Sequence, residues 1–106
     1  LEPQRGAGYA QRASAHWRLR DLDAALRDAD AAVRHSAATG LRLALRAVLH
    51  DDRRDWPRVE ADATAAHEHG CGADALPWRA LARLRTGRVD EALGDARLAR
   101  RLDPTR

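Results

Sequence analysis

The chain has little of several residue types, and each shortage narrows the folds and sites that are possible. Its 106 residues include no lysine, phenylalanine or methionine, one cysteine, and only four aromatic residues, Tyr9, Trp17, Trp56 and Trp78. Because large aromatic side chains are so few, a core must be built from small and aliphatic residues. A lone cysteine excludes an internal disulfide and fits a reducing compartment, so we expect a cytoplasmic location.

Long apolar stretches and charge of one sign are also missing. No apolar run approaches the roughly 18 residues that span a bilayer, so we expect no membrane contact. The 19 basic residues, all arginine, exceed the 16 acidic ones by only 3 and alternate with aspartates. The longest basic runs are the pairs 53–54 and 100–101. Mixed charge of this kind is typical of a solvated helical face and argues against a nucleic-acid partner.

The chain is rich in residues that favour helices. Alanine, leucine and arginine dominate, and no stretch alternates apolar and polar residues over the length of a strand. A chain of this length fits one domain with a thin core. We therefore predict a single all-α domain over residues 1–106. Because the chain begins at Leu1 without a methionine, we expect it to be a fragment of a longer protein.

Capping residues and apolar spacing divide the chain into six helices arranged as three hairpins. Asp21 and Asp55 can each accept hydrogen bonds from the free amides of the helix that follows. Pro57 and Pro77 suit the first turn of a helix, where a missing amide donor has little effect. The predicted helices cover residues 8–18, 22–35, 41–52, 56–69, about 75–86 and 89–102.

The three hairpins repeat at a nearly constant interval. Asp21, Asp55 and Arg88 come into register at periods of 34 and then 33 residues, a length at which helix pairs form solenoids. The units cover about residues 5–38, 39–72 and 73–105. Small residues then coincide at three positions, where helices are expected to cross closely: Ala13, Ala47 and Ala80; Ala25, Val59 and Ala92; Ala32, Ala66 and Ala99.

The stretch 87–104, GRVDEALGDARLARRLDP, is the clearest copy of the unit. With the 34-residue period, it resembles the tetratricopeptide repeat family over almost the whole chain. The resemblance implies three antiparallel hairpins stacked as a short right-handed superhelix. The chain departs from the family pattern where Leu43 and Leu76 replace the early aromatic residue that Tyr9 supplies, and where the closing proline occurs only as Pro104.

A second regularity pairs one arginine with one aspartate in each unit. Arg12, Arg46 and Arg79 occupy one repeat position, and an aspartate follows each of them 16 residues later. Because the two positions lie on partner helices, we predict a bidentate salt bridge within every unit. The alternative is two separate solvated charges. The predicted aspartate partners are Asp28, Asp62 and Asp95.

No arrangement of residues in the sequence indicates a catalytic site or a metal site. His67, His69 and Cys71 are good zinc ligands in type, but residues two apart on a helix point about 200° apart. The sequence has no nucleophile elbow, glycine-rich phosphate loop or paired carboxylates in an apolar setting. We therefore expect no catalytic residue, no metal and no cofactor.

In tetratricopeptide arrays the first helix of each unit lines the concave surface, and the resemblance carries that role over by register. The apolar centre of this surface, rimmed by arginines, suits an amphipathic helix or an extended segment with an acidic flank. The absence of lysine and asparagine argues against a clamp for a terminal carboxylate. The implied partner-binding residues are Gln11, Ser14, Arg18, Leu45, Val48, Asp52, Trp78, Leu81 and Arg85.

The sequence thus predicts a non-catalytic adaptor that binds a protein or peptide. Two alternatives stay open: a helical repeat that binds RNA, and a homo-oligomerisation module of a larger regulatory protein. In the second case the apolar centre of the concave surface packs against a second copy of the chain or against neighbouring parts of the longer protein. Polar base-reading side chains, which the RNA alternative needs, are not supplied by Leu45, Val48 and Asp52.

Overall fold

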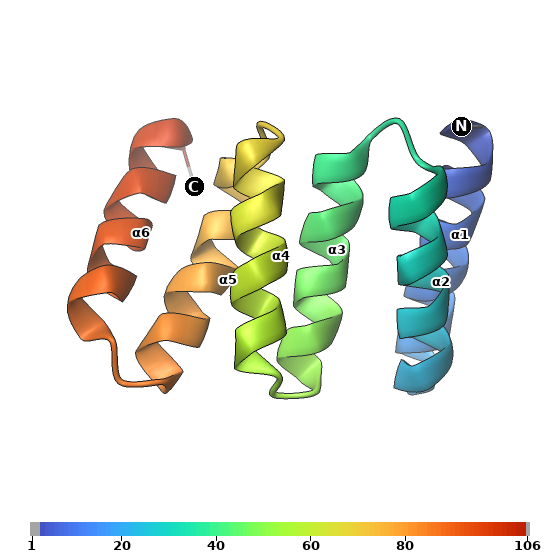
Figure 1. Ribbon diagram of the computed structural model, residues 1–106, viewed down its shortest axis with the longest axis horizontal. Coiled ribbons are helices and arrows are strands. Elements are labelled where there is room, and N and C mark those ends of the chain that lie inside the picture. Colours follow the sequence, from blue (N-terminus) through green and yellow to red (C-terminus); the bar gives the residue numbers. More distant parts are fainter. Residues whose placement is uncertain (1–2, 106) are drawn as a thin grey trace.

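The computed structural model describes residues 3–105, which form an all-helical row (Figure 1). The N-terminal helix stands at one end of the row and the C-terminal helix at the other. Within the described residues there are six helices and no strand. They are α1 (Pro3–Arg18), α2 (Leu22–His35), α3 (Thr39–Asp52), α4 (Trp56–Glu68), α5 (Gly72–Arg85) and α6 (Val89–Leu102).

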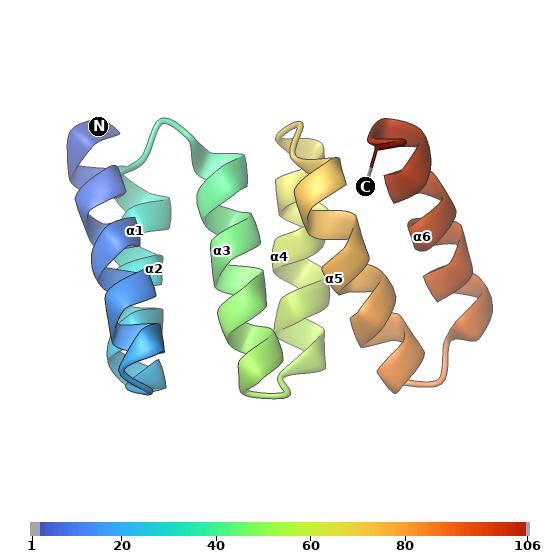
Figure 2. The same ribbon diagram turned by 180° about the vertical axis from the view of Figure 1, so that it is seen from behind.

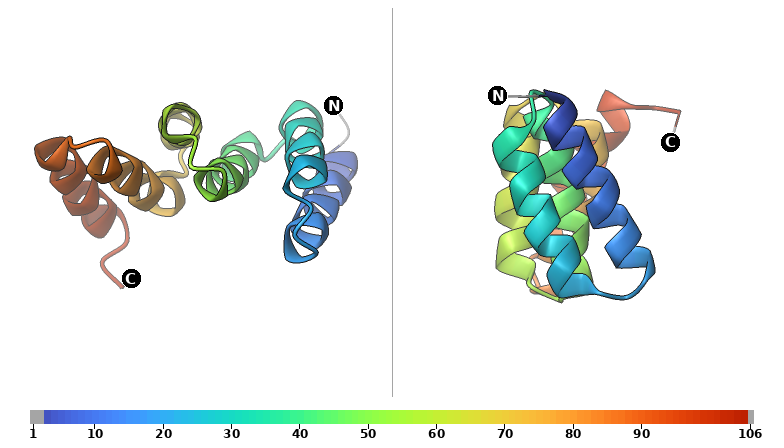
Figure 3. Two further views of the ribbon diagram at one scale, coloured as in Figure 1. Left: turned by 90° about the horizontal axis from the view of Figure 1, so that it is seen from below. Right: turned by 90° about the vertical axis from the view of Figure 1, so that its right-hand side faces the viewer.

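The helices stack as three antiparallel hairpins, as the sequence predicts. α1 packs on α2, α3 on α4 and α5 on α6, while contacts of α2 with α3 and of α4 with α5 join successive hairpins. α1 also contacts α3, and α3 contacts α5, so the odd-numbered helices share one face. Figure 2 shows this order from behind, and the left view of Figure 3, from below, looks along the helix axes and shows the three hairpins following one another along the row.

α2 and α6 have the predicted bounds, whereas the first helix of each hairpin begins earlier than predicted. α3 begins at Thr39 and α5 at Gly72, so Gly40 and Gly72, which the prediction left outside the helices, lie in their first turns. They are needed for close packing, because a Cβ on Gly40 would lie 2.8 Å from the Cys71 sulfur. The prediction for Pro77 was therefore wrong: it lies in the second turn of α5, where it removes one hydrogen bond.

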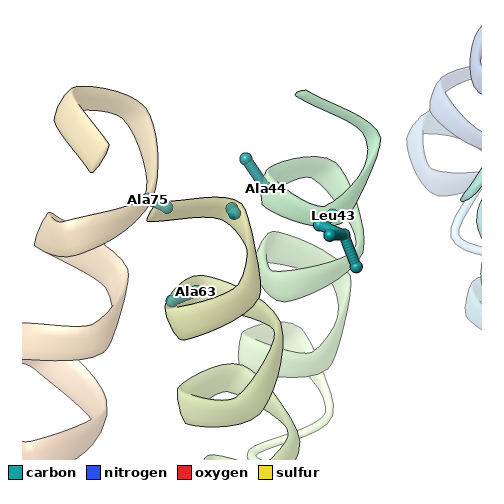
Figure 4. Close-up of a cluster of buried hydrophobic side chains, with 5 residues drawn as sticks. Leu43, Ala44, Ala63 and Ala75 are labelled. Atoms are coloured by element: carbon teal, nitrogen blue, oxygen red, sulfur yellow. The ribbon is translucent and has the colours of Figure 1, made fainter. Parts of the chain in front are cut away.

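The core is thin and made mostly of alanine, which lets helices approach closely. One cluster joins Leu43 and Ala44 of α3 to Ala63 of α4 and Ala75 of α5 (Figure 4). A second cluster places Leu49 of α3 against alanines of α1 and α2. The small residues that coincide in the repeat have no exposed surface in the first two hairpins: Ala13, Ala25, Ala32, Ala47, Val59 and Ala66.

The turn within each hairpin uses one residue in the left-handed region. Arg20 has φ of 65°, Arg54 has φ of 58° and Gly87 has φ of 83°. These residues are equivalent in the repeat, and a capping residue follows one position later. The side chains of Asp21 and Asp55 accept the expected hydrogen bonds, from Ala24 at 3.1 Å and from Arg58 at 3.3 Å. Of these three turns, only the third has glycine at this position, the residue that the left-handed conformation favours.

We expect Arg54→Gly to stabilise the chain by roughly 0.5–1 kcal/mol, since glycine relieves the left-handed strain at some entropic cost. Chemical denaturation followed by circular dichroism measures the change. Arg54→Ala is the matched control, because it removes the same side chain but keeps the Cβ. Equal stabilities of the two variants would contradict the role assigned to the backbone.

Candidate functional site

A groove runs across α1, α3 and α5, on the face that the odd-numbered helices share. We call it the odd-helix groove, and its volume is about 640 Å³. Ala10 and Ala44, 6% and 7% exposed, are among the small residues that line it. Because the two alanines are almost fully covered by their neighbours, they form its floor. Six of the predicted partner-binding residues line the groove: Gln11, Ser14, Arg18, Leu45, Val48 and Trp78.

The other three predicted residues lie outside this lining. The carboxylate of Asp52 accepts a hydrogen bond from the indole Nε1 of Trp17 at 2.6 Å, which ties the end of α3 to α1. The Arg85 guanidinium lies over the Trp56 ring, 4.7 Å from its centroid. Leu81 is half-buried on α5. Asp52 and Arg85 are thus engaged with tryptophans of the chain itself.

Sequence reasoning missed Leu41, Arg42 and Asp74, which also line the odd-helix groove. Asp74 lies in the first turn of α5, which the prediction left outside the helix, whereas Leu41 and Arg42 lie within the predicted helix 41–52. Helical spacing in the sequence could have identified two of these residues. Leu41 lies four residues before Leu45, and Asp74 lies four residues before Trp78, so each pair shares a helix face.

The groove combines apolar surface with guanidinium groups. The Leu41 side chain is 47% exposed, and Arg18 is exposed at the groove's margin. The Nε atom of Arg42 is buried and has no hydrogen-bond partner among the described residues. Asp74 adds one carboxylate to the same lining. This arrangement suits a ligand with an apolar side chain and at least one acidic group.

The arginine–aspartate pairs lie between the helices of each hairpin. Arg46 donates to Asp62 through Nε at 2.8 Å and through Nη2 at 2.9 Å. Arg79 donates to Asp95 through the same two atoms at 3.0 and 2.7 Å. Both aspartates are buried, at 6% and 4% exposure. These two bridges therefore have the predicted bidentate geometry.

The first hairpin departs from that geometry. Arg12 makes a single hydrogen bond to Asp28, from Nη2 at 3.1 Å, and its side chain is 65% exposed. The expectation of a bidentate bridge was wrong here. The physical reason is position: α1 stands at the end of the row, so no preceding helix encloses the guanidinium. Arg12 lies over the Tyr9 ring instead, 5.4 Å from its centroid.

Each buried aspartate also faces a second basic side chain, one helical turn after the arginine. In the first two hairpins this is a histidine, with Nε2 of His16 3.5 Å from Asp28 and Nε2 of His50 3.5 Å from Asp62. In the third it is Arg83, which donates to Asp95 at 2.9 Å. The sequence could have predicted this second contact, because the three basic residues occupy equivalent positions in the repeat.

The two bidentate arginines also reach back to the preceding hairpin. Nη1 of Arg46 donates to Asp30 of α2 at 3.1 Å. Nη1 of Arg79 donates to Thr64 of α4 at 3.0 Å. Asp30 and Thr64 occupy one repeat position, so each arginine joins three successive helices by the same set of atoms.

Burial and ion pairing shift several pKa values. Hydrogen bonds to Asp62 raise the pKa of Arg46, which keeps this guanidinium charged. Burial lowers the pKa of His50, and this effect exceeds the opposing attraction of Asp62. At the surface, the hydrogen bond from Arg88 lowers the pKa of Glu60, which also faces Arg83. Of these groups only His50 belongs to a residue type whose ordinary pKa lies near neutral pH.

The described residues contain no group of three or more histidine, cysteine or acidic side chains arranged to hold a metal ion. His67 is half-buried beside Gly72, where a Cβ would meet its ring, whereas His69 follows the end of α4 and is exposed. Cys71 stands at the start of α5. Across residues 3–105, no helix combines the length and the apolar character needed to cross a membrane.

Comparison with solved structures identifies the fold. The chain superposes with a TM-score of 0.93 on the first tetratricopeptide-repeat domain of Spaghetti (RPAP3), solved bound to the HSP90 peptide SRMEEVD. The match covers 100% of this chain and 87% of that one, at 16% sequence identity. No family model and no curated protein sequence matches the chain. The chain therefore has the tetratricopeptide-repeat fold.

We expect Asp62→Ala to destabilise the chain by about 2–4 kcal/mol, because it leaves Arg46 half-buried without its bidentate partner. Arg12→Ala is the control and should cost less than about 1 kcal/mol, since the Arg12 side chain is 65% exposed and makes a single hydrogen bond to Asp28. Urea denaturation of both variants measures the difference. Equal losses for the two variants would contradict the importance of burial.

His50 should make the chain less stable in mild acid. Because burial lowers its folded pKa, the unfolded chain binds more protons as pH falls. This contribution to stability is complete above the unfolded pKa of about 6.5 and is lost as pH falls below it. We expect His50→Gln to lose less stability than the parent chain between pH 7.5 and 5.5 in urea denaturation. Identical pH dependence of the two proteins would refute this expectation.

Proposed function

We propose that the chain is a non-catalytic module that binds a peptide segment of a partner protein in the odd-helix groove. The observation that carries the proposal is the groove itself, where six side chains expected from repeat register line one hollow of about 640 Å³. Leu41, Leu45 and Val48 supply apolar surface along α3. Apolar strips of this kind bind amphipathic helices or extended segments.

The charges at the groove define the partner's chemistry. Arg18 and Arg42 lie on α1 and α3, so they flank the apolar strip on different helices. A guanidinium pairs well with a carboxylate, which favours a segment with acidic residues beside an apolar anchor. The structural neighbour was solved with SRMEEVD, a peptide in which three of seven residues are acidic. The present chain has no lysine or asparagine, so we propose that it reads acidic side chains rather than a chain terminus.

Selection from a displayed library of random twelve-residue peptides tests this proposal. We expect the enriched sequences to contain a leucine or an aromatic residue close to two or more acidic residues. A labelled peptide of the enriched sequence then gives a Kd by fluorescence polarisation. That Kd should rise with salt concentration, because the guanidinium groups are near the surface.

Two variants locate the binding on the molecule. We expect Trp78→Ala and Arg18→Glu each to raise the Kd about tenfold or more, a loss of roughly 1.4 kcal/mol or more in binding free energy. Arg34→Glu is the matched charge control, since Arg34 is exposed on α2 and lies outside the groove. Circular dichroism checks that each variant folds. Enriched peptides without acidic residues, or equal binding by all three variants, would overturn the proposal.

A further inference from the structure

A second apolar groove lies between α5 and α6, at the end of the row. We call it the end groove, and its volume is about 340 Å³. Figure 1 shows that α6 is the last helix of the row. Two charged residues, Arg100 and Asp103, complete a lining that is otherwise apolar. The apolar part consists of Ala73, Pro77, Ala80, Ala96 and Ala99.

The same repeat positions are covered in the first two hairpins. Ala63 and Ala66, the equivalents of Ala96 and Ala99, have no exposed surface because Ala75 of α5 packs against them (Figure 4). One hairpin earlier, Leu49 of α3 packs in the same cluster as Ala13 and Ala29, which are also fully buried. In both places the covering element is the first helix of the next hairpin. The end groove therefore has the form of a surface that accepts a helix.

The charge at this surface is different from that at the two covered ones. The covering helices donate from Arg46 to Asp30 and from Arg79 to Thr64. The equivalent of Asp30 and Thr64 on α6 is Arg97, which is exposed. A covering helix with an arginine at the usual position would thus meet a like charge. A carboxylate at that position would instead pair with Arg97.

We infer that the end groove binds an amphipathic helix of a partner protein, in the place that the first helix of a fourth hairpin would occupy. Small apolar side chains of this helix fill the groove, and an acidic side chain pairs with Arg97. Arg100 replaces His67 of the preceding hairpin and adds a second positive charge at the rim. The end groove shares no lining residue with the odd-helix groove, although both are lined in part by α5.

A second copy of the chain fits this surface poorly. In a head-to-tail stack, α1 of the next copy would take the covering position and bring Arg12 against Arg97. The residues of α1 equivalent to Leu45 and Leu49 are Gln11 and Ala15, which are polar or small and are both exposed. Charge and side-chain size therefore both favour a partner of different sequence.

A pair of peptides taken from the chain itself tests the inference. The α5 segment, residues 72–85, already fits such a groove, so a helix-stapled and labelled copy of it serves as the probe. One form keeps Arg79 and the other carries Arg79→Glu. Fluorescence polarisation measures the binding of each peptide to the 106-residue chain. We expect the peptide with Arg79→Glu to bind at least tenfold more tightly than the peptide that keeps Arg79. In the Arg97→Asp variant of the chain, the preference should reverse.

Further variants separate this site from the odd-helix groove. Ala99→Trp should fill the end groove and abolish binding of the glutamate peptide, whereas Trp78→Ala should leave that binding unchanged. Circular dichroism reports on folding, and if Ala99→Trp does not fold, the Arg97→Asp exchange decides alone. Absence of binding by both peptides, or the same preference in both forms of the chain, would overturn the inference. A dimer in sedimentation equilibrium that Arg97→Asp alters would assign the groove to a second copy and would also overturn it.

Discussion

The stacking of this chain depends on a buried carboxylate between the two helices of each hairpin. A core of alanines brings helices close together but contributes little apolar surface per residue, so charged groups come to lie between the helices as well. Asp62 and Asp95 are almost fully covered, and an unpaired charge at that depth would be strongly unfavourable. The guanidinium groups of Arg46 and Arg79 satisfy them with two hydrogen bonds each. The ion pair is therefore a condition of the close packing that alanine permits.

The same guanidinium also sets the distance between hairpins. Two of its nitrogens serve the aspartate of its own hairpin and the third reaches the preceding one, at Asp30 or Thr64. A planar group with donors in fixed directions restricts the relative orientation of the three helices that it joins. This orientation places α1, α3 and α5 side by side and leaves the odd-helix groove between them. The arrangement of helices that the ion pairs favour is thus also the one that forms the proposed binding surface.

The sequence predicted the hairpins well because their signals are local. The caps Asp21 and Asp55 and the apolar spacing act within a few residues, so the starts of α2 and α4 and both ends of α6 were predicted correctly. The starts of α3 and α5 could not be predicted in the same way. Gly40 looks like a break in isolation, and only its contact with Cys71, which is distant in sequence, shows why glycine is required. The missed turn of α5 contains Asp74, so that part of the groove lining was missed with it, whereas Leu41 and Arg42 lay inside the predicted helix and were not recognised as groove residues.

Repeat register predicts which residues are equivalent, but not how position along the row changes their role. Arg12 matches Arg46 in sequence, yet at the end of the row its side chain is exposed and makes a single hydrogen bond instead of a bidentate pair. At the other end, Ala96 matches the fully buried Ala63 and is exposed. The role of a residue therefore cannot be predicted from the shared pattern of the unit alone. It also depends on the positions that differ between units, above all on the change from Asp30 and Thr64 to Arg97, which places a positive charge on α6 where the earlier hairpins have a carboxylate or a hydroxyl group.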